Sequence, residues 1–195
     1  MTSIDWYDAN AEAFAARTFG PGMEGDRARF LAHVPDGGAV LDAGCGSGRD
    51  ALAFKRAGFA VSAFDGSSRL AEIASANTGL AVRTLTFAEM DWEAAFDGVW
   101  ACASLLHLPA ADLPGALANI RRALLPGGVF YASFKEGAEE RLANGRHFTD
   151  LNQTMLRQLL TAANFEPIGI WSSADGRTDH AGESWVSAVA RRPLG

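Results

Sequence analysis

The chain has 195 residues, 48% of them hydrophobic, and a formal net charge of −6 with a pI near 5.2. This length and composition suit one domain with a sizeable core. No run of Lys and Arg is present to contact phosphates, so we expect no nucleic-acid partner. We expect no membrane span, because apolar stretches such as 99–106 are too short. The N-terminus lacks a signal-peptide pattern and the two cysteines are no disulfide framework, so we expect a cytoplasmic protein.

Strand-like and helix-like segments alternate between residues 24 and 165, which predicts a parallel sheet with crossover helices. The expected helices cover 24–34, 48–57, 67–76, 112–125 and 152–164. The expected strands cover 39–43, 59–64, 80–87, 98–103, 129–134, 165–171 and 183–190. Segment 89–96 leaves little room for a full crossover helix. Residues 135–150 are polar and charged, and we expect one long loop there.

The most informative segment, residues 40–48, reads Val-Leu-Asp-Ala-Gly-Cys-Gly-Ser-Gly, an apolar strand that leads into a glycine-rich turn. Its three glycines let the backbone turn tightly and approach a ligand closely. A helix follows, whose first N–H groups point into the same space. A dinucleotide site would want glycine or alanine at position 49, where this chain has Arg49. Together with Asp42, this pattern favours a nucleoside ligand without a pyrophosphate; the alternative is an ordinary strand–turn–helix connection.

The G-x-G-x-G spacing with Asp42 ahead of it resembles motif I of the class I S-adenosylmethionine-dependent methyltransferases. The resemblance extends over residues 6–192. It implies a single α/β domain over 1–195, with a Rossmann-like, seven-stranded, mostly parallel sheet, helices on both faces and an antiparallel last strand beside the fifth. It implies S-adenosylmethionine as the cofactor, S-adenosylhomocysteine as the product, and no metal. Segments 48–50, 175–178 and 188–192 are similar to tellurite-resistance-type methyltransferases, although 135–150 and 172–182 match no motif of that subgroup.

Acidic side chains follow the second and third predicted strands. Asp65 could accept two hydrogen bonds from ribose hydroxyls, or complement the dipole of the next helix. The resemblance implies that Glu89 with Met90, or else Asp91, reads the adenine edge; a solvated acidic turn is the alternative. It also implies that small residues after the fourth strand line the methionine part of the cofactor. The expected cofactor-binding residues are Tyr7, Asp42, Gly44, Cys45, Gly46, Gly48, Arg49, Asp65, Gly66, Ser67, Glu89, Met90, Ala103 and Ser104.

Two further residues are expected near the transferred methyl group. His107 could act as a base near neutral pH, or cap the segment 109–112 as a structural histidine. The segment 6–14 resembles the lid helix of small-molecule methyltransferases, within an N-terminal lid segment over 1–20. There the aromatic Tyr7 would close over the carboxylate or the sulfonium end of the cofactor. A terminal helix packed on the sheet edge is the alternative.

A set of cations follows the fifth strand, and we expect it to form one wall of the acceptor pocket. It consists of Lys135, Arg141, Arg146, His147 and Arg177, interspersed with acids. Solvated surface charge is one interpretation. The other is that two or three of these cations bind an anionic acceptor, with Arg146 as the first candidate because a guanidinium binds a carboxylate or oxyanion in a bidentate way.

The sequence therefore predicts methyl transfer from S-adenosylmethionine to a small-molecule acceptor by in-line displacement, in a monomer or homodimer. One alternative is a nicotinamide-dependent oxidoreductase, although Arg49 stands where the dinucleotide fingerprint has its third glycine. The other is a non-catalytic S-adenosylmethionine-binding module.

Overall fold

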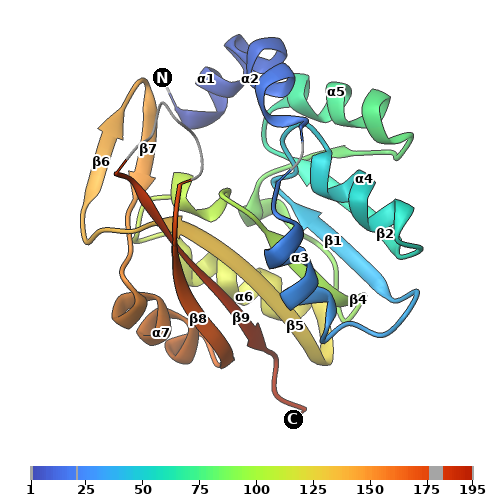
Figure 1. Ribbon diagram of the computed structural model, residues 1–195, viewed down its shortest axis with the longest axis vertical. Helices are drawn as coiled ribbons and strands as arrows, with labels where there is room; N and C mark the ends of the chain where they lie inside the picture. The colour runs from blue at the N-terminus through green and yellow to red at the C-terminus, as the bar shows by residue number, and fades with distance from the viewer. Residues whose placement is uncertain (1, 21, 176–181, 195) are drawn as a thin grey trace.

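The fold is built on one twisted seven-stranded sheet, seen in a computed structural model that describes residues 2–20, 22–175 and 182–194 (Figure 1). The strand order is β3-β2-β1-β4-β5-β9-β8. β9 runs antiparallel between β5 and β8, and the other neighbours are parallel, as expected. The strands are β1 (Ala39–Ala43), β2 (Ala60–Asp65), β3 (Arg83–Thr84), β4 (Phe96–Ala101), β5 (Leu124–Lys135), β8 (Glu166–Ala174) and β9 (Ser184–Arg191).

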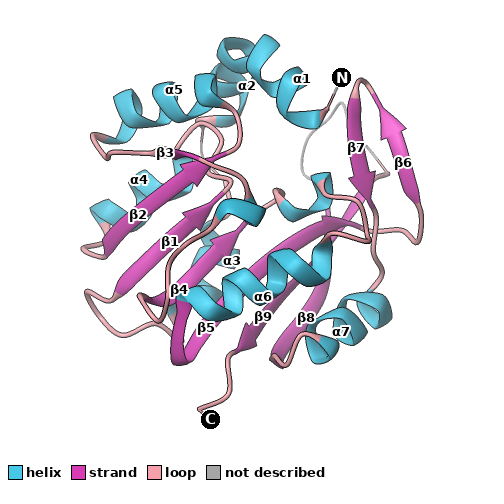
Figure 2. Ribbon diagram, turned by 180° about the vertical axis from the view of Figure 1, so that it is seen from behind, coloured by secondary structure: helices cyan, strands magenta, loops and turns pink. Residues whose placement is uncertain are grey.

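Helices cover both faces of this sheet. α3 (Glu24–Leu31), α4 (Arg49–Arg56) and α5 (Ser68–Thr78) lie on the side seen in Figure 1, and α6 (Leu113–Ala123) and α7 (Gln153–Ala162) on the side seen in Figure 2. α1 (Ser3–Ala9) and α2 (Ala11–Thr18) sit over the carboxyl edge of the parallel strands. Two short 3-10 helices, η1 (Phe87–Glu89) and η2 (Leu105–His107), follow β3 and β4. Within the described ranges, no helix has the length and apolar character needed to cross a membrane.

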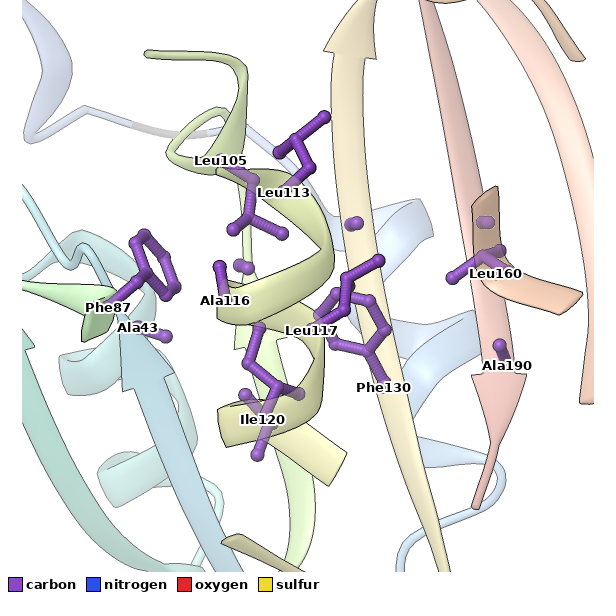
Figure 3. Packing of buried hydrophobic residues seen from close by; sticks show 14 of the residues in the cluster. Ala43, Phe87, Leu105, Leu113, Ala116, Leu117, Ile120, Phe130, Leu160 and Ala190 are labelled. Carbon is purple, nitrogen blue, oxygen red and sulfur yellow. The ribbon is translucent and has the colours of Figure 1, made fainter. Parts of the chain in front are cut away.

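The core divides into two main layers, one on each face of the sheet. On the α6–α7 side, Leu113, Leu117 and Ile120 are buried on one face of α6, as its apolar spacing predicts (Figure 3). On the opposite side, Trp100 of β4 stacks on Tyr131 of β5 with ring centroids 3.8 Å apart, and aromatic side chains of α3 and α4 pack on the pair. The strands are therefore fixed from both faces, which gives their carboxyl ends defined positions.

Two predicted elements differ from the structure. Residues 135–150 are not a loop: β6 (Glu140–Ala143) and β7 (Arg146–Thr149) form a hairpin whose turn, Asn144-Gly145, has φ values of 51° and 78°. Asn-Gly is the preferred pair for a two-residue hairpin turn with positive φ at both positions, a signal that the polarity of the segment concealed. The third strand is also shorter than the expected 80–87, because it pairs only at the tip of β2.

Candidate active site

A cleft of about 1240 Å³ opens along the carboxyl edge of the sheet. The tips of β1, β2, β4, β5 and β9 contribute side chains to its lining, and so do α1, α2 and the β6–β7 hairpin. Ligands of open α/β sheets bind at this edge, where the chain order reverses. The volume exceeds that of a typical single-ligand pocket, so the cleft has room for two small molecules.

The glycine turn forms the floor of the cleft after β1. Gly44, Gly46 and Gly48 all have positive φ, at 76°, 55° and 80°. A Cβ on Gly44 would lie 2.5 Å from the Cβ of Ser104, and one on Gly48 would lie 2.7 Å from a methyl group of Thr78. These glycines are therefore required both by the backbone conformation and by close packing. The turn, with Cys45, lines the cleft as the sequence predicts.

Asp65 lies at the tip of β2 and holds the glycine turn in place. Its Oδ2 accepts a hydrogen bond from Gly46 N at 2.8 Å, and its Oδ1 accepts one from Ser67 N at 2.9 Å. Burial raises the pKa of the carboxyl to about 6, because these two bonds only partly replace lost hydration. Each oxygen keeps acceptor capacity toward the cleft, where Gly66 and Ser67 also lie. Asp65 thus has a structural role that sequence reasoning missed.

Asp42 is 2% exposed, and its Oδ2 has no hydrogen-bond partner among the described residues. Burial, with the nearby charge of Asp50, raises the pKa of this carboxyl well above its usual range. A buried carboxylate oxygen without a donor is costly, and such atoms mark places where a ligand or water completes the structure. Arg49 does not satisfy it, since its Nη2 pairs with Asp50 Oδ2 at 2.8 Å. Asp50 also accepts a hydrogen bond from the Trp100 indole.

The segment after β3 differs in register from the sequence expectation. Glu89 accepts hydrogen bonds from Thr86 N and Oγ1, both at 2.8 Å, and so caps η1. Met90 is buried in the core, and Asp91 pairs with Arg83 on the surface. None of the three lines the cleft, whereas Leu85, Thr86 and Phe87 do.

Ala103 and Ser104 do line the cleft after β4, as expected. The Ala103 backbone has a φ of 51°, and its N–H donates to Ser133 Oγ at 2.9 Å. Ser104 Oγ donates to the Ala43 carbonyl at 2.8 Å, which joins the tips of β4 and β1. Both residues therefore occupy fixed positions beside the glycine turn.

His107 and Tyr7 form a hydrogen-bonded pair in the cleft. His107 Nδ1 lies 2.8 Å from the His147 carbonyl, and Nε2 lies 2.8 Å from the Tyr7 hydroxyl. A carbonyl only accepts, so Nδ1 carries the proton. Burial lowers the pKa of His107 to about 4, so the ring is neutral and its Nε2 accepts from Tyr7. His107 would therefore have to release Tyr7 before it could take a proton from an acceptor.

Arg146 stands beside this pair, at the start of β7. Its guanidinium lies 4.3 Å from the Trp6 ring and 5.1 Å from the Phe148 ring, and Nη1 donates to the Tyr7 hydroxyl at 3.3 Å. Its buried Nε has no hydrogen-bond partner in the described part of the chain, and no carboxylate there pairs with the guanidinium. The side chain lines the cleft.

The other described members of the predicted set all contact acidic side chains. Lys135 is buried between Asp175 and Glu183. Arg141 pairs with Asp150, and His147 Nε2 lies 3.1 Å from a carboxylate oxygen of Glu140. Arg177 lies outside the described residues. Of the described cations in the predicted set, Arg146 is thus the one that could bind an external anion.

α1 and α2 pack directly on the glycine turn and on the start of α5. A Cβ on Gly66 would lie 3.0 Å from Ile4, and one on Gly46 would lie 3.2 Å from the Phe14 ring. Asp8 accepts hydrogen bonds from Ser67 Oγ at 2.5 Å and from Arg69 N at 3.1 Å, which fastens α1 to the start of α5.

Sequence reasoning missed the half of the cleft that lies over β5 and β9. Tyr131, Ser133 and Ser187 line it, together with Asp26 of α3. The signal was present in β5: Tyr131, Ser133 and Lys135 are polar residues at alternate positions of an otherwise apolar strand, which places them on one face.

Comparisons with known proteins agree with this geometry. A family model described as a methyltransferase domain matches residues 40–128. The malonyl-acyl-carrier-protein O-methyltransferase of Erwinia pyrifoliae is 34% identical over 144 residues, which are 67% of this chain and 53% of that protein. The chain thus spans about half the length of this curated relative. The similarity to tellurite-resistance-type enzymes stays a prediction.

Two solved structures show the same architecture. The 1,6-didemethyltoxoflavin-N1-methyltransferase of Burkholderia thailandensis, solved with 1,6-didemethyltoxoflavin and S-adenosylhomocysteine, has a TM-score of 0.82 and 28% identity, covering 97% of this chain and 87% of that one. The 4+2 cyclase SpnF has a TM-score of 0.77 at 21% identity, covering 100% and 97%, which is a likeness of fold alone. Taken with the glycine turn and the sheet order, these matches place the chain in the family of S-adenosylmethionine-dependent methyltransferases.

Proposed function

We propose that this chain binds S-adenosylmethionine and transfers its methyl group to a small-molecule acceptor. The observation that carries the proposal is the unpartnered Oδ2 of Asp42, buried beside the glycine turn. An ammonium group supplies the donor that this oxygen lacks, and the amino-acid end of S-adenosylmethionine has one. The toxoflavin-precursor methyltransferase, with bound S-adenosylhomocysteine, supports the same ligand.

The lining of the cleft fits the rest of this cofactor. Asp65 has acceptor capacity left for ribose hydroxyls, as expected from the sequence. We assign the adenine side to Thr86 and Phe87, in place of Glu89 and Met90, because only the former pair lines the cleft. Small residues after β4, with Cys45 and Arg49, leave room for the methionine portion.

The cofactor, when bound, supplies an electrophilic methyl group on a good leaving group. What the protein must do is hold the acceptor in line with it and exclude water, and proximity of this kind is worth roughly 7–11 kcal/mol. The Tyr7 proton is committed to His107, so its oxygen presents lone pairs to Arg146 and to the cleft. We therefore assign His107 a positioning role, in place of the base expected from the sequence: it aims the Tyr7 oxygen, the partially negative end, at the cationic part of the cofactor.

Arg146 would bind an anionic group of the acceptor. Its guanidinium is held by aromatic rings on two sides, and its Nε is buried without a partner, so a carboxylate or oxyanion would satisfy it. The malonyl-acyl-carrier-protein O-methyltransferase relative acts on a substrate with a malonyl group, which supports an acidic acceptor.

The test has two steps. Calorimetry should show S-adenosylhomocysteine binding at micromolar or tighter affinity and no NAD binding; the reverse result would favour the oxidoreductase alternative. Turnover is then measured with small nucleophiles, each offered as a free carboxylate and as its methyl ester. The carboxylates should react better, and Arg146→Ala should raise their KM about tenfold with cofactor affinity unchanged. Arg141→Ala is the matched control from the same hairpin. Equal use of both forms would refute the role of Arg146.

A second candidate function is binding of the cofactor without methylation, since the fold that this chain shares with the SpnF cyclase does not by itself determine chemistry. Such a protein would bind S-adenosylhomocysteine, but it would form no S-adenosylhomocysteine from S-adenosylmethionine with any of the small nucleophiles tested.

A further inference from the structure

The half of the cleft over β5 and β9 contains a row of small polar side chains between two rows of large ones. Ser133 of β5 lies directly opposite Ser187 of β9 in the antiparallel register. One level nearer the carboxyl edge, Lys135 faces Trp185, and one level deeper Tyr131 stacks on Trp100. We call Tyr131, Ser133 and Ser187 the hydroxyl shelf; all three line the cleft.

The hydrogen bonds of the shelf have a fixed direction. The Tyr131 hydroxyl lies 2.9 Å from Asp26 Oδ2 and 3.2 Å from Ser187 Oγ. It has one proton to donate, and the Asp26 carboxylate can only accept, since its other oxygen pairs with Arg29 at 3.0 Å. Tyr131 therefore donates to Asp26, and Ser187 donates to Tyr131. Burial raises the pKa of Tyr131 well above its usual range, so the phenol is neutral in the resting protein.

This direction leaves Ser187 Oγ with lone pairs and no proton to offer. Ser133 is already engaged, because its Oγ accepts from Ala103 N at 2.9 Å and donates to Cys102 Sγ. The charge that β5 brings to this half, Lys135, is paired with Asp175 and Glu183. Ser187, which is 1% exposed, thus offers an uncharged hydrogen-bond acceptor in the wall of the cleft, opposite Ser133.

We propose that the hydroxyl shelf binds the reacting group of the methyl acceptor, that this group carries an N–H or O–H that donates to Ser187 Oγ, and that Tyr131 and Asp26 fix this direction. The inference rests on the proposed function. The shelf would bind the atom that is methylated, whereas Arg146 would bind a separate anionic group of the same acceptor molecule.

The same chain of hydroxyls gives the released proton an exit. In the reaction the bond from sulfur to the methyl carbon breaks, its electron pair stays on sulfur, and a bond from carbon to the acceptor nitrogen or oxygen forms. The acceptor's proton moves to Ser187 Oγ, the Ser187 proton to Tyr131, and the Tyr131 proton to Asp26. The Asp26 side chain is 16% exposed, so it can return the proton to water. Asp26 would thus be the final proton acceptor, a role that His107 cannot take because both of its ring nitrogens are hydrogen-bonded.

The experiment compares indole with benzofuran, two flat isosteres of which indole alone has an N–H to donate. Each is titrated into the protein loaded with S-adenosylhomocysteine, and binding is followed by calorimetry. Indole should bind about 3- to 10-fold more tightly than benzofuran, the range of one neutral hydrogen bond. Ser187→Ala should remove this preference. Ser173→Ala, a hydroxyl deletion on the cleft rim of β8, should keep it.

Two further variants test the positioning residues. Asp26→Asn supplies an amide donor that can reverse the direction, so the preference for indole should vanish or invert. Tyr131→Phe keeps the ring stacked on Trp100 but removes the hydroxyl that joins Ser187 to Asp26, so the preference for indole should again be lost. A purely structural role would weaken both probes equally.

The outcomes separate the two proposals. Failure to bind S-adenosylhomocysteine overturns the proposed function. If the protein binds it but shows no preference for indole, binds neither probe, or keeps the preference in Ser187→Ala and Asp26→Asn, the shelf proposal is wrong and the proposed function stands.

Discussion

The raised pKa of Asp65 predicts that cofactor affinity depends on pH in a narrow window. In the ligand-free protein this carboxyl has a pKa of about 6, because it is buried with only two hydrogen bonds and lies near Asp8. Ribose hydroxyls donate to the charged form, so binding should return the pKa to its ordinary value near 4 or below. Below pH 6, S-adenosylhomocysteine must therefore displace a proton in order to bind.

The expected change in affinity with pH follows from the pKa values of Asp65 in the free protein and in the complex. At pH 5 about nine-tenths of the free protein is protonated at Asp65 and the complex is mostly ionised, so affinity should be about tenfold weaker than at pH 8, or about 1.4 kcal/mol. The same group affects folding with a definite sign. Its folded pKa is raised, so its contribution to stability is present below pH 3.8 and is lost as pH rises through about 6, a change of roughly 3 kcal/mol.

Calorimetry at pH 5 to 8, in buffers of different ionisation enthalpy, measures both the affinity and the protons released. Asp65 should release about half a proton at pH 6 and almost none at pH 8. Comparison with Asp65→Asn separates this release from that of Asp42, whose raised pKa also falls when the carboxylate pairs with the ammonium group. Asp65→Asn should bind weakly without this pH dependence, and Asp8→Asn should move the midpoint lower by removing a nearby negative charge. The titration of His107, near pH 4, lies below this window. An affinity that stays flat from pH 5 to 8 in the unmodified protein would refute the role of Asp65.

Two other predictions concern the glycine turn and the Tyr7–His107 pair. Gly46→Val should lower the melting temperature and weaken cofactor binding, because a φ of 55° costs an L-residue roughly 1–2 kcal/mol and the Phe14 ring lies 3.2 Å from the new Cβ; an unchanged calorimetric melting curve would contradict this. Tyr7→Phe and His107→Phe should each weaken S-adenosylhomocysteine binding, and the double variant should be less impaired than their sum, because they share one hydrogen bond. Strict additivity would show that the pair does not act as a unit.

Features encoded in short stretches of sequence were predicted well. The glycine turn, Asp42 and Asp65 all lie at the tips of adjacent parallel strands, so local pattern and sheet topology suffice to bring them together. Glu89 shows the limit of a position taken from a resemblance. Thr86-x-x-Glu89 is a capping box, and attention to that local signal would have assigned the carboxylate to its own backbone.

Features that depend on distant partners could not be predicted from the sequence. The availability of His107 as a base was decided by Tyr7, 100 residues earlier, and by a carbonyl 40 residues later. In the same way, only the structure distinguishes Arg146 from the paired cations, because the acids beside them are spread evenly along the sequence. The shelf was missed because Ser133 and Ser187 meet only through the antiparallel pairing of β5 with β9.

The contacts between α1 and the β6–β7 hairpin have a consequence for how the chain acquires its structure. Trp6 packs on the Gly145 turn, and Ser3 Oγ accepts from His147 N at 3.0 Å, so the first helix docks on residues synthesised some 140 positions later. Closing so long a loop is entropically costly and follows the formation of local contacts. On a ribosome α1 can therefore dock on α5 as soon as that helix has emerged, whereas its contacts with the hairpin form only later. A nascent chain that stalls before residue 140 should therefore be cleaved by a protease near Trp6. The complete chain, in which Trp6 packs on the Gly145 turn, should resist cleavage there.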